Sequence, residues 1–173
     1  MQYLQLKKNL KKNFAGLKSI KLGLLGDSST QFLSVALRGC GYDAGYDLEI
    51  FEGDYNQIDQ QVFNKRSELY KFSPDIVIIF RSTQKMMGFF YELEGQGKLR
   101  FASAELQKLD DLAEALNTNT PGCKIIYLNF PEIDDGVFGN YSNKTAMSFT
   151  YQLRKINFGL MDLSQKIKNL FIS

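Results

Sequence analysis

Ser28 is the residue whose neighbours best prepare it for chemistry. It follows the apolar run 20–25 and the turn residue Asp27, and it precedes Ser29 and Thr30. This order predicts a buried strand that passes through a tight turn into a helix, with hydroxyls at the helix N-cap. Open α/β sheets place ligand sites at the carboxyl ends of their strands. We therefore expect the Ser28 hydroxyl at such a site, as a nucleophile or as a cap and anion ligand.

Candidate binding residues also follow the other predicted strands. These strands are 46–51, 76–80 and 124–128. The residues after them are Gly53, Arg81, Ser82 and Asn129. A backbone N–H of Gly53 and the guanidinium of Arg81 could contact a carboxylate or a phosphate. Alternatively, Gly53 only makes the turn, and Arg81 pairs with Asp27 or Asp54 to hold the loops.

The elements that must position these residues alternate between strand and helix. Helical spacing covers 31–38, 56–72 and 102–116, and a glycine-rich turn over 39–45 ends the first of these helices. The alternation predicts an α/β fold, a three-layer α/β/α sandwich with a parallel sheet of four or five strands. A flavodoxin-like strand order, 2-1-3-4, would bring three strand ends to one crevice. The substrate-binding or anion-binding residues expected beside Ser28 are Asp27, Ser29, Gly53, Arg81, Ser82 and Asn129.

Both ends of the chain are predicted to be helical. Residues 1–26 carry six lysines and no acidic residue. A helix over about 1–18 would dock an acidic partner, or it would pack its leucines on the sheet and solvate its lysines. Apolar residues at heptad-like intervals predict a long helix over about 144–171. The end of that helix would project toward another domain or subunit, or the whole helix would lie on this domain.

Composition limits the classes of protein to which the chain can belong. Its 173 residues predict a single domain over 1–173, and no apolar run is long enough to span a membrane. Two cysteines suggest no disulfide framework and favour a reduced, cytoplasmic protein. A net charge of +2 gives no reason to expect nucleic acid as a partner.

Several stretches resemble known families. Residues 26–28 look like the nucleophile block of the SGNH (GDSL) hydrolases, and Gly53 is placed like their second block. A wider set is similar to the N-terminal domain of FkbH-like proteins. It comprises 24–31, 67–70, 74–75, 135–141, 148–149 and 153–157.

The resemblance implies a partner domain. FkbH-like proteins join an SGNH-like domain to a HAD-type phosphatase domain, and members load glyceryl-type three-carbon units onto acyl carrier proteins. It therefore implies a downstream HAD domain, an acyl carrier protein, and an acyl or phosphorylated three-carbon substrate. The HAD nucleophile motif D-x-D-x-T/V does not occur in these residues. Mg²⁺ is accordingly expected only in the HAD domain, and no cofactor is expected here.

The chain departs from the SGNH pattern in two ways. It contains no histidine, and Arg81-Ser82-Thr83 stands where the third-block asparagine is expected. A serine hydroxyl without a base is a poor nucleophile at neutral pH. One hypothesis is therefore a binding domain that serves a HAD partner. The other is a serine-dependent esterase or acyl-transfer enzyme in which Ser28 uses an unusual or externally supplied base.

Overall fold

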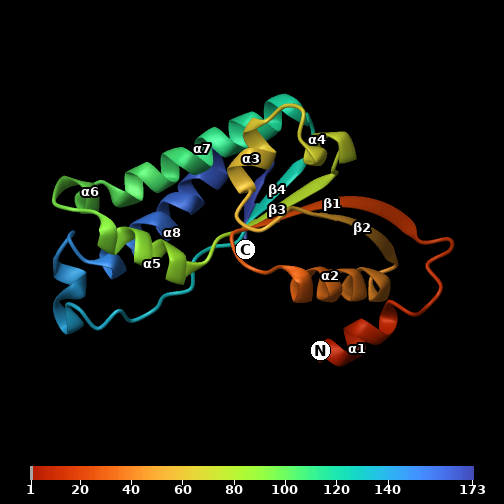
Figure 1. The fold of residues 1–173 in the computed structure, drawn as a ribbon, viewed down its shortest axis with the longest axis horizontal. Coiled ribbons are helices and arrows are strands. Elements are labelled where there is room, and N and C mark those ends of the chain that lie inside the picture. The colour runs from red at the N-terminus through yellow and green to blue at the C-terminus, as the bar shows by residue number, and fades with distance from the viewer. Residues whose placement is uncertain (1) are drawn as a thin grey trace.

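A parallel five-stranded sheet in the order β2-β1-β3-β4-β5 forms the centre of the fold (Figure 1). The computed structural model describes residues 2–173. Its strands are β1 (Lys18–Gly26), β2 (Tyr46–Glu52), β3 (Ile76–Phe80), β4 (Lys124–Tyr127) and β5 (Leu170–Ile172). The predicted α/β class and the order 2-1-3-4 are confirmed, and β5 adds a fifth strand. The central β3 is buried on both faces over 77–79, as its β-branched run predicts.

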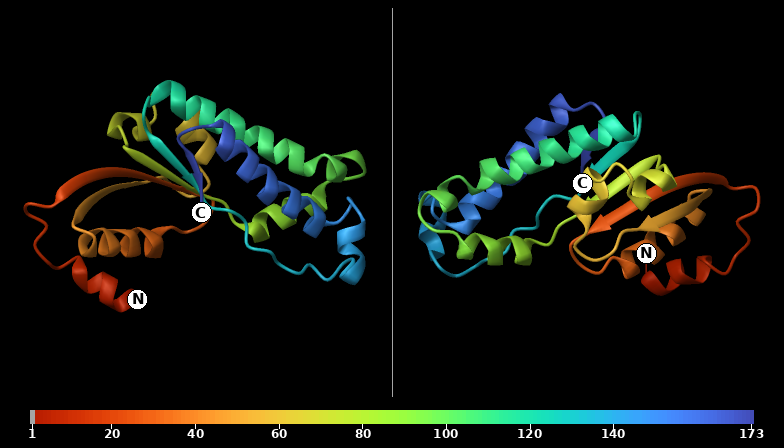
Figure 2. Two further views of the ribbon diagram at one scale, coloured as in Figure 1. Left: turned by 180° about the vertical axis from the view of Figure 1, so that it is seen from behind. Right: turned by 45° about the horizontal axis from the view of Figure 1, so that its top comes forward.

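Helices cover the two faces unequally. The α-helices are α1 (Tyr3–Asn9), α2 (Gln31–Asp43), α3 (Ile58–Phe63), α4 (Glu68–Phe72), α5 (Thr83–Glu92), α6 (Gln96–Leu99), α7 (Phe101–Asn119) and α8 (Phe149–Lys166). A 3₁₀ helix, η1, spans Gly139–Lys144. Figures 1 and 2 show α1 and α2 beneath β1 and β2, whereas α3, α4, α7 and α8 lie on the opposite side of the sheet. None of the helices within residues 2–173 is both long and apolar enough to cross a membrane.

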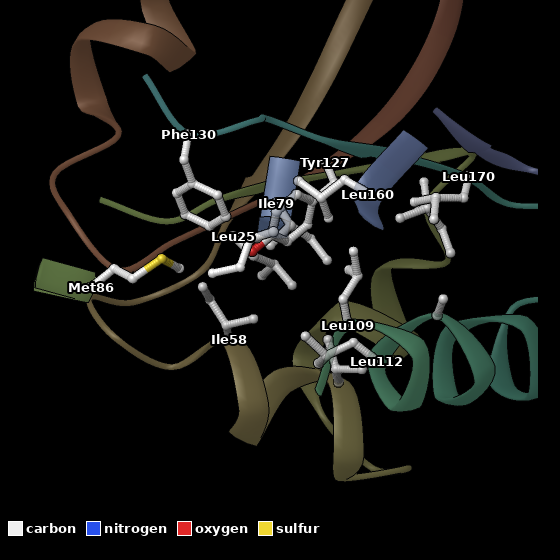
Figure 3. Packing of buried hydrophobic residues seen from close by; sticks show 14 of the residues in the cluster. Leu25, Ile58, Ile79, Met86, Leu109, Leu112, Tyr127, Phe130, Leu160 and Leu170 are labelled. Carbon is white, nitrogen blue, oxygen red and sulfur yellow. The ribbon is translucent and has the colours of Figure 1, made fainter. Parts of the chain in front are cut away.

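The larger core lies between the sheet and the helices α3, α4, α5, α7 and α8 (Figure 3). Alternate strand residues such as Leu25, Ile79 and Tyr127 point into it, as the two-residue repeat of a strand requires. Leu109 and Leu112 of α7 meet them from the helical layer. A smaller core on the other face is built around Leu22, Leu24 and Ile78.

The predicted N-terminal helix over about 1–18 is wrong in its extent, since α1 ends at Asn9. The Asn13 side chain accepts a hydrogen bond from the Ala15 N–H at 2.9 Å, and Gly16 has a φ of 84°. These local bonds and angles divert the backbone from a helix before β1 begins. The helix packs on α2 rather than on the sheet, with Leu6 buried and the neighbouring lysines exposed.

The predicted turn over 39–45 is also wrong, because α2 continues to Asp43. Gly39 lies where α1 crosses α2, and a Cβ there would lie 2.5 Å from the Leu6 carbonyl oxygen. This glycine serves close helix packing and not chain reversal. The reversal falls at Gly45, whose φ of 83° favours glycine.

The predicted C-terminal helix over about 144–171 is wrong at both ends. Ser148 caps α8 by accepting a hydrogen bond from the Tyr151 N–H at 3.1 Å, and the helix ends at Lys166. The Asn169 side-chain amide then donates to the Cys123 carbonyl at 2.6 Å, and the backbone carbonyl of Asn169 accepts from the Ile125 N–H. These bonds place the following residues beside β4 as a strand, so the apolar stripe of α8 packs on this domain.

The two thiols should differ sharply in reactivity. Cys40 is exposed and Cys123 is buried, and neither forms a disulfide. Burial raises the pKa of the Cys123 thiol to about 11, so at pH 8 roughly a thousandth of it is thiolate. We expect iodoacetamide at pH 8 to modify one thiol per native chain, at Cys40. Peptide mass spectrometry checks this, with a chain unfolded in urea as the control. Equal modification of both thiols in the native chain would contradict it.

Candidate functional site

Asp27 ties together the carboxyl ends of β1 and β3. Its backbone N–H donates to the Phe80 carbonyl at 3.2 Å. Its two carboxylate oxygens accept from the Ser82 N–H at 2.9 and 3.1 Å. The Ser28 hydroxyl donates to the same carboxylate at 3.1 Å. Asp27 therefore holds the start of α5 and the predicted nucleophile in fixed positions, as a charge-assisted acceptor can.

Ser28 lies at the expected strand end, in a recess of about 400 Å³. Ser29 and Gly53 line the same recess. The predicted N–H of Gly53 is not offered to a ligand there, because it donates to the Leu24 carbonyl at 2.9 Å. The hydroxyl of Thr30 does not cap α2 either, since it donates to Glu52 at 2.6 Å. The recess thus presents hydroxyls and carboxylates.

Arg81 lines a separate recess of about 290 Å³ together with Asp27 and Ser82. Its guanidinium donates to Asp59 at 3.2 Å and to Glu105 at 3.4 Å. The expected pairing of Arg81 with Asp27 or Asp54 is therefore wrong. Two carboxylates from α3 and α7 meet it instead, and its side chain is 16% exposed.

Lys85 lies between the two recesses, and it is not among the site residues that the sequence predicts. It lines the Arg81 recess, its ammonium lies 4.1 Å from the Tyr55 ring centroid, and Tyr55 lines the Ser28 recess. The same ammonium donates to the Asp27 carbonyl oxygen. The sequence does hold a signal, because Ser82 after the strand is a good N-cap and Lys85 comes three residues later.

Asn129 lies apart from both recesses. It is exposed after β4, and its backbone N–H donates to the Ser173 carbonyl at 2.8 Å. In the loop that follows, the carboxylates of Asp134 and Asp135 accept from backbone N–H groups two residues ahead, which is turn geometry. Burial raises the pKa of the Tyr91 hydroxyl, and its hydrogen bond to Asp135 raises this pKa further. The hydroxyl therefore stays protonated and holds this loop to α5. Within residues 2–173 no three potential metal-ligating side chains gather.

Comparisons with known proteins agree with this geometry. A profile of the FkbH N-terminal domain matches residues 21–173. The crystal structure of the N-terminal part of a Bacteroides fragilis protein, containing a phosphatase domain complexed with Mg, is similar to this chain with 36% identity and a TM-score of 0.93. The match covers 99% of this chain and 44% of that one, so the chain spans less than half of its relative. Among curated protein sequences the comparison found no match.

Two more distant structures share the fold. TesA superposes with a TM-score of 0.58 at 14% identity, over 87% of this chain and 76% of its own. A GDSL-like lipase candidate from Parabacteroides merdae superposes with a TM-score of 0.60 at 12% identity, over 92% and 79%. The fold is therefore the SGNH-like three-layer sandwich.

Proposed function

The chain belongs to the FkbH N-terminal domain family, and we propose that it is a binding domain without hydrolase activity of its own. It would act in a longer polypeptide, beside a HAD-type phosphatase or glyceryl-transfer domain. The relative of known structure supports this arrangement, because its chain contains a phosphatase domain and extends well beyond the matched part.

The surroundings of Ser28 carry the proposal. Acyl transfer by serine needs a base for the hydroxyl proton and N–H donors for the oxyanion. The Ser28 hydroxyl donates to the carboxylate of Asp27, and the chain contains no histidine. The Gly53 N–H is used by the Leu24 carbonyl. This strand end therefore keeps the serine in its SGNH position, but the base beside it is the carboxylate of Asp27, which is weaker than an imidazole, and the Gly53 N–H is not free for an oxyanion.

The ligand would be an acyl or phosphorylated three-carbon compound, free or carried by an acyl carrier protein. Hydroxyls of Ser28 and Ser29 and the ammonium of Lys85 stand at the two recesses to hold its polar end. An acidic carrier protein would meet the exposed lysines of α1, Lys7 and Lys8. Mg²⁺ would be held by the phosphatase domain. The compartment would be the cytoplasm, where an exposed thiol stays reduced.

We expect a fluorophosphonate probe to leave Ser28 unlabelled, because the probe needs an activated serine. Hydrolysis of p-nitrophenyl acetate should be the same for the wild-type chain and for Ser28→Ala. Labelling followed by mass spectrometry, together with the two hydrolysis rates, checks this.

A GDSL lipase provides the positive control for both reagents. Both measurements should be repeated on the longer protein, where a base from another domain would be present. Labelling of Ser28 that disappears in Ser28→Ala would refute the proposal, and it would establish the serine-dependent enzyme in its place.

A further inference from the structure

Helices cover β4 and β5 on one face of the sheet only. On the first face, Ile125 and Tyr127 of β4 and Leu170 of β5 are buried under α7 and α8. On the second face, α2 packs against β2 and β1. In Figures 1 and 2, no helix of the described chain lies beneath β4 and β5 on that side. The two faces of the same strands thus have different surroundings.

An apolar row crosses the second face toward the open side. In the strand register, Leu24 pairs with Ile78, Ile78 with Ile126, and Ile126 with Phe171. Burial falls along this row. Leu24 is fully buried, Ile126 is partly buried, and Phe171 is 48% exposed on the edge strand β5. Leu128, directly after β4, extends the partly covered area. Cross-strand apolar rows normally lie under a second layer.

The topology indicates which segment would cover this row. The α2 connection runs from β1 outward to β2 on the second face, while α7 and α8 carry the chain in the opposite direction on the first face. Right-handed crossovers divide the two directions between the faces in this way. A segment that leaves β5 and turns back toward β1 follows the direction of α2, and therefore lies on the second face.

We propose that the segment following β5 in the longer protein packs an apolar side against Ile126, Leu128 and Phe171, next to α2. This inference rests on the proposed function in that it requires a longer polypeptide, of the kind the relative with 44% coverage has. The packed segment would complete the third layer of the sandwich. It would also fix the start of the phosphatase domain against the edge of the sheet that is remote from β2.

Maleimide labelling of single cysteines tests the proposal. In a Cys40→Ser background, Phe171→Cys would be compared in the 173-residue chain and in the longer protein. Labelling at Phe171→Cys should be at least about tenfold slower in the longer protein, because a covered thiol reacts only through local opening. The matched control is Phe158→Cys, since Phe158 is 63% exposed on the outer side of α8. Its labelling rate should be equal in the two proteins.

Three results would overturn the proposal. Equal rates at Phe171→Cys in the two proteins would show that no segment covers this face. Protection of Phe158→Cys instead of Phe171→Cys would place the contact on α8. Protection of Phe171→Cys in the 173-residue chain that is lost on dilution would show that a second copy covers it. None of these results changes the labelling of Ser28, so the binding function stands or fails separately.

Discussion

Replacing Phe90 by alanine should lower the free energy of unfolding by about 3–5 kcal/mol. Phe90 is fully buried where α5, α7 and α8 meet. Its ring centroid lies 5.2 Å from that of Phe101 and 5.5 Å from that of Phe149. Truncation removes these contacts and leaves a cavity that three helices cannot close without moving. Urea unfolding followed by circular dichroism measures the loss, since the chain has no tryptophan.

The matched control is Phe158→Ala, which removes the same atoms from an exposed position on α8. Its free energy of unfolding should stay within about 0.5 kcal/mol of the wild-type value. A cost below about 1 kcal/mol for Phe90→Ala would mean that α5 is not packed as described. The packing of α5 also matters for the site, because this helix carries Lys85 and is capped by Ser82.

The parts of the fold that could be predicted are those determined by local pattern. The continuous β-branched run of β3 and the strand-turn-helix around Asp27 have short-range signatures, and both are found where expected. The errors arose where a tertiary contact decides. Gly39 serves helix packing because α1 crosses it, and no residue next to it in the sequence carries that information. The stretch after α8 becomes a strand because β4 offers it a free edge.

The candidate site was predicted as one crevice and is found as two recesses. Strand order was sufficient to place Ser28, Gly53 and Arg81 at the same end of the sheet. Pattern alone could not show what each group would bond to. The carboxylates of Asp59 and Glu105 approach Arg81 from α3 and α7, which are distant in the sequence. Side-chain pairing of this kind depends on how layers dock, and a strand order contains no such information.

Replacing Arg81 by methionine should cost about 2–3 kcal/mol, because Glu105 is left buried with one cation. The Glu105 side chain is 8% exposed, and its remaining partner is Lys108 at 2.5 Å. Methionine keeps much of the volume of arginine, so the loss reports charge and not a cavity. Urea unfolding measures it. Asp59→Asn serves as the control, since the Asp59 side chain is 69% exposed and should contribute below about 1 kcal/mol.

A double-mutant cycle decides whether Arg81 holds the fold or holds a ligand. If its main partner is Glu105, the variant Arg81→Met with Glu105→Gln should recover about 1 kcal/mol or more relative to the sum of the single changes. Inorganic phosphate should then raise the melting temperature of wild type and Arg81→Met equally. The opposite pattern would be an additive cycle together with phosphate stabilisation that is lost in Arg81→Met. That pattern would make the guanidinium an anion ligand. We expect the equal shifts, because a cation already neutralised by two carboxylates has little charge left to attract a phosphate.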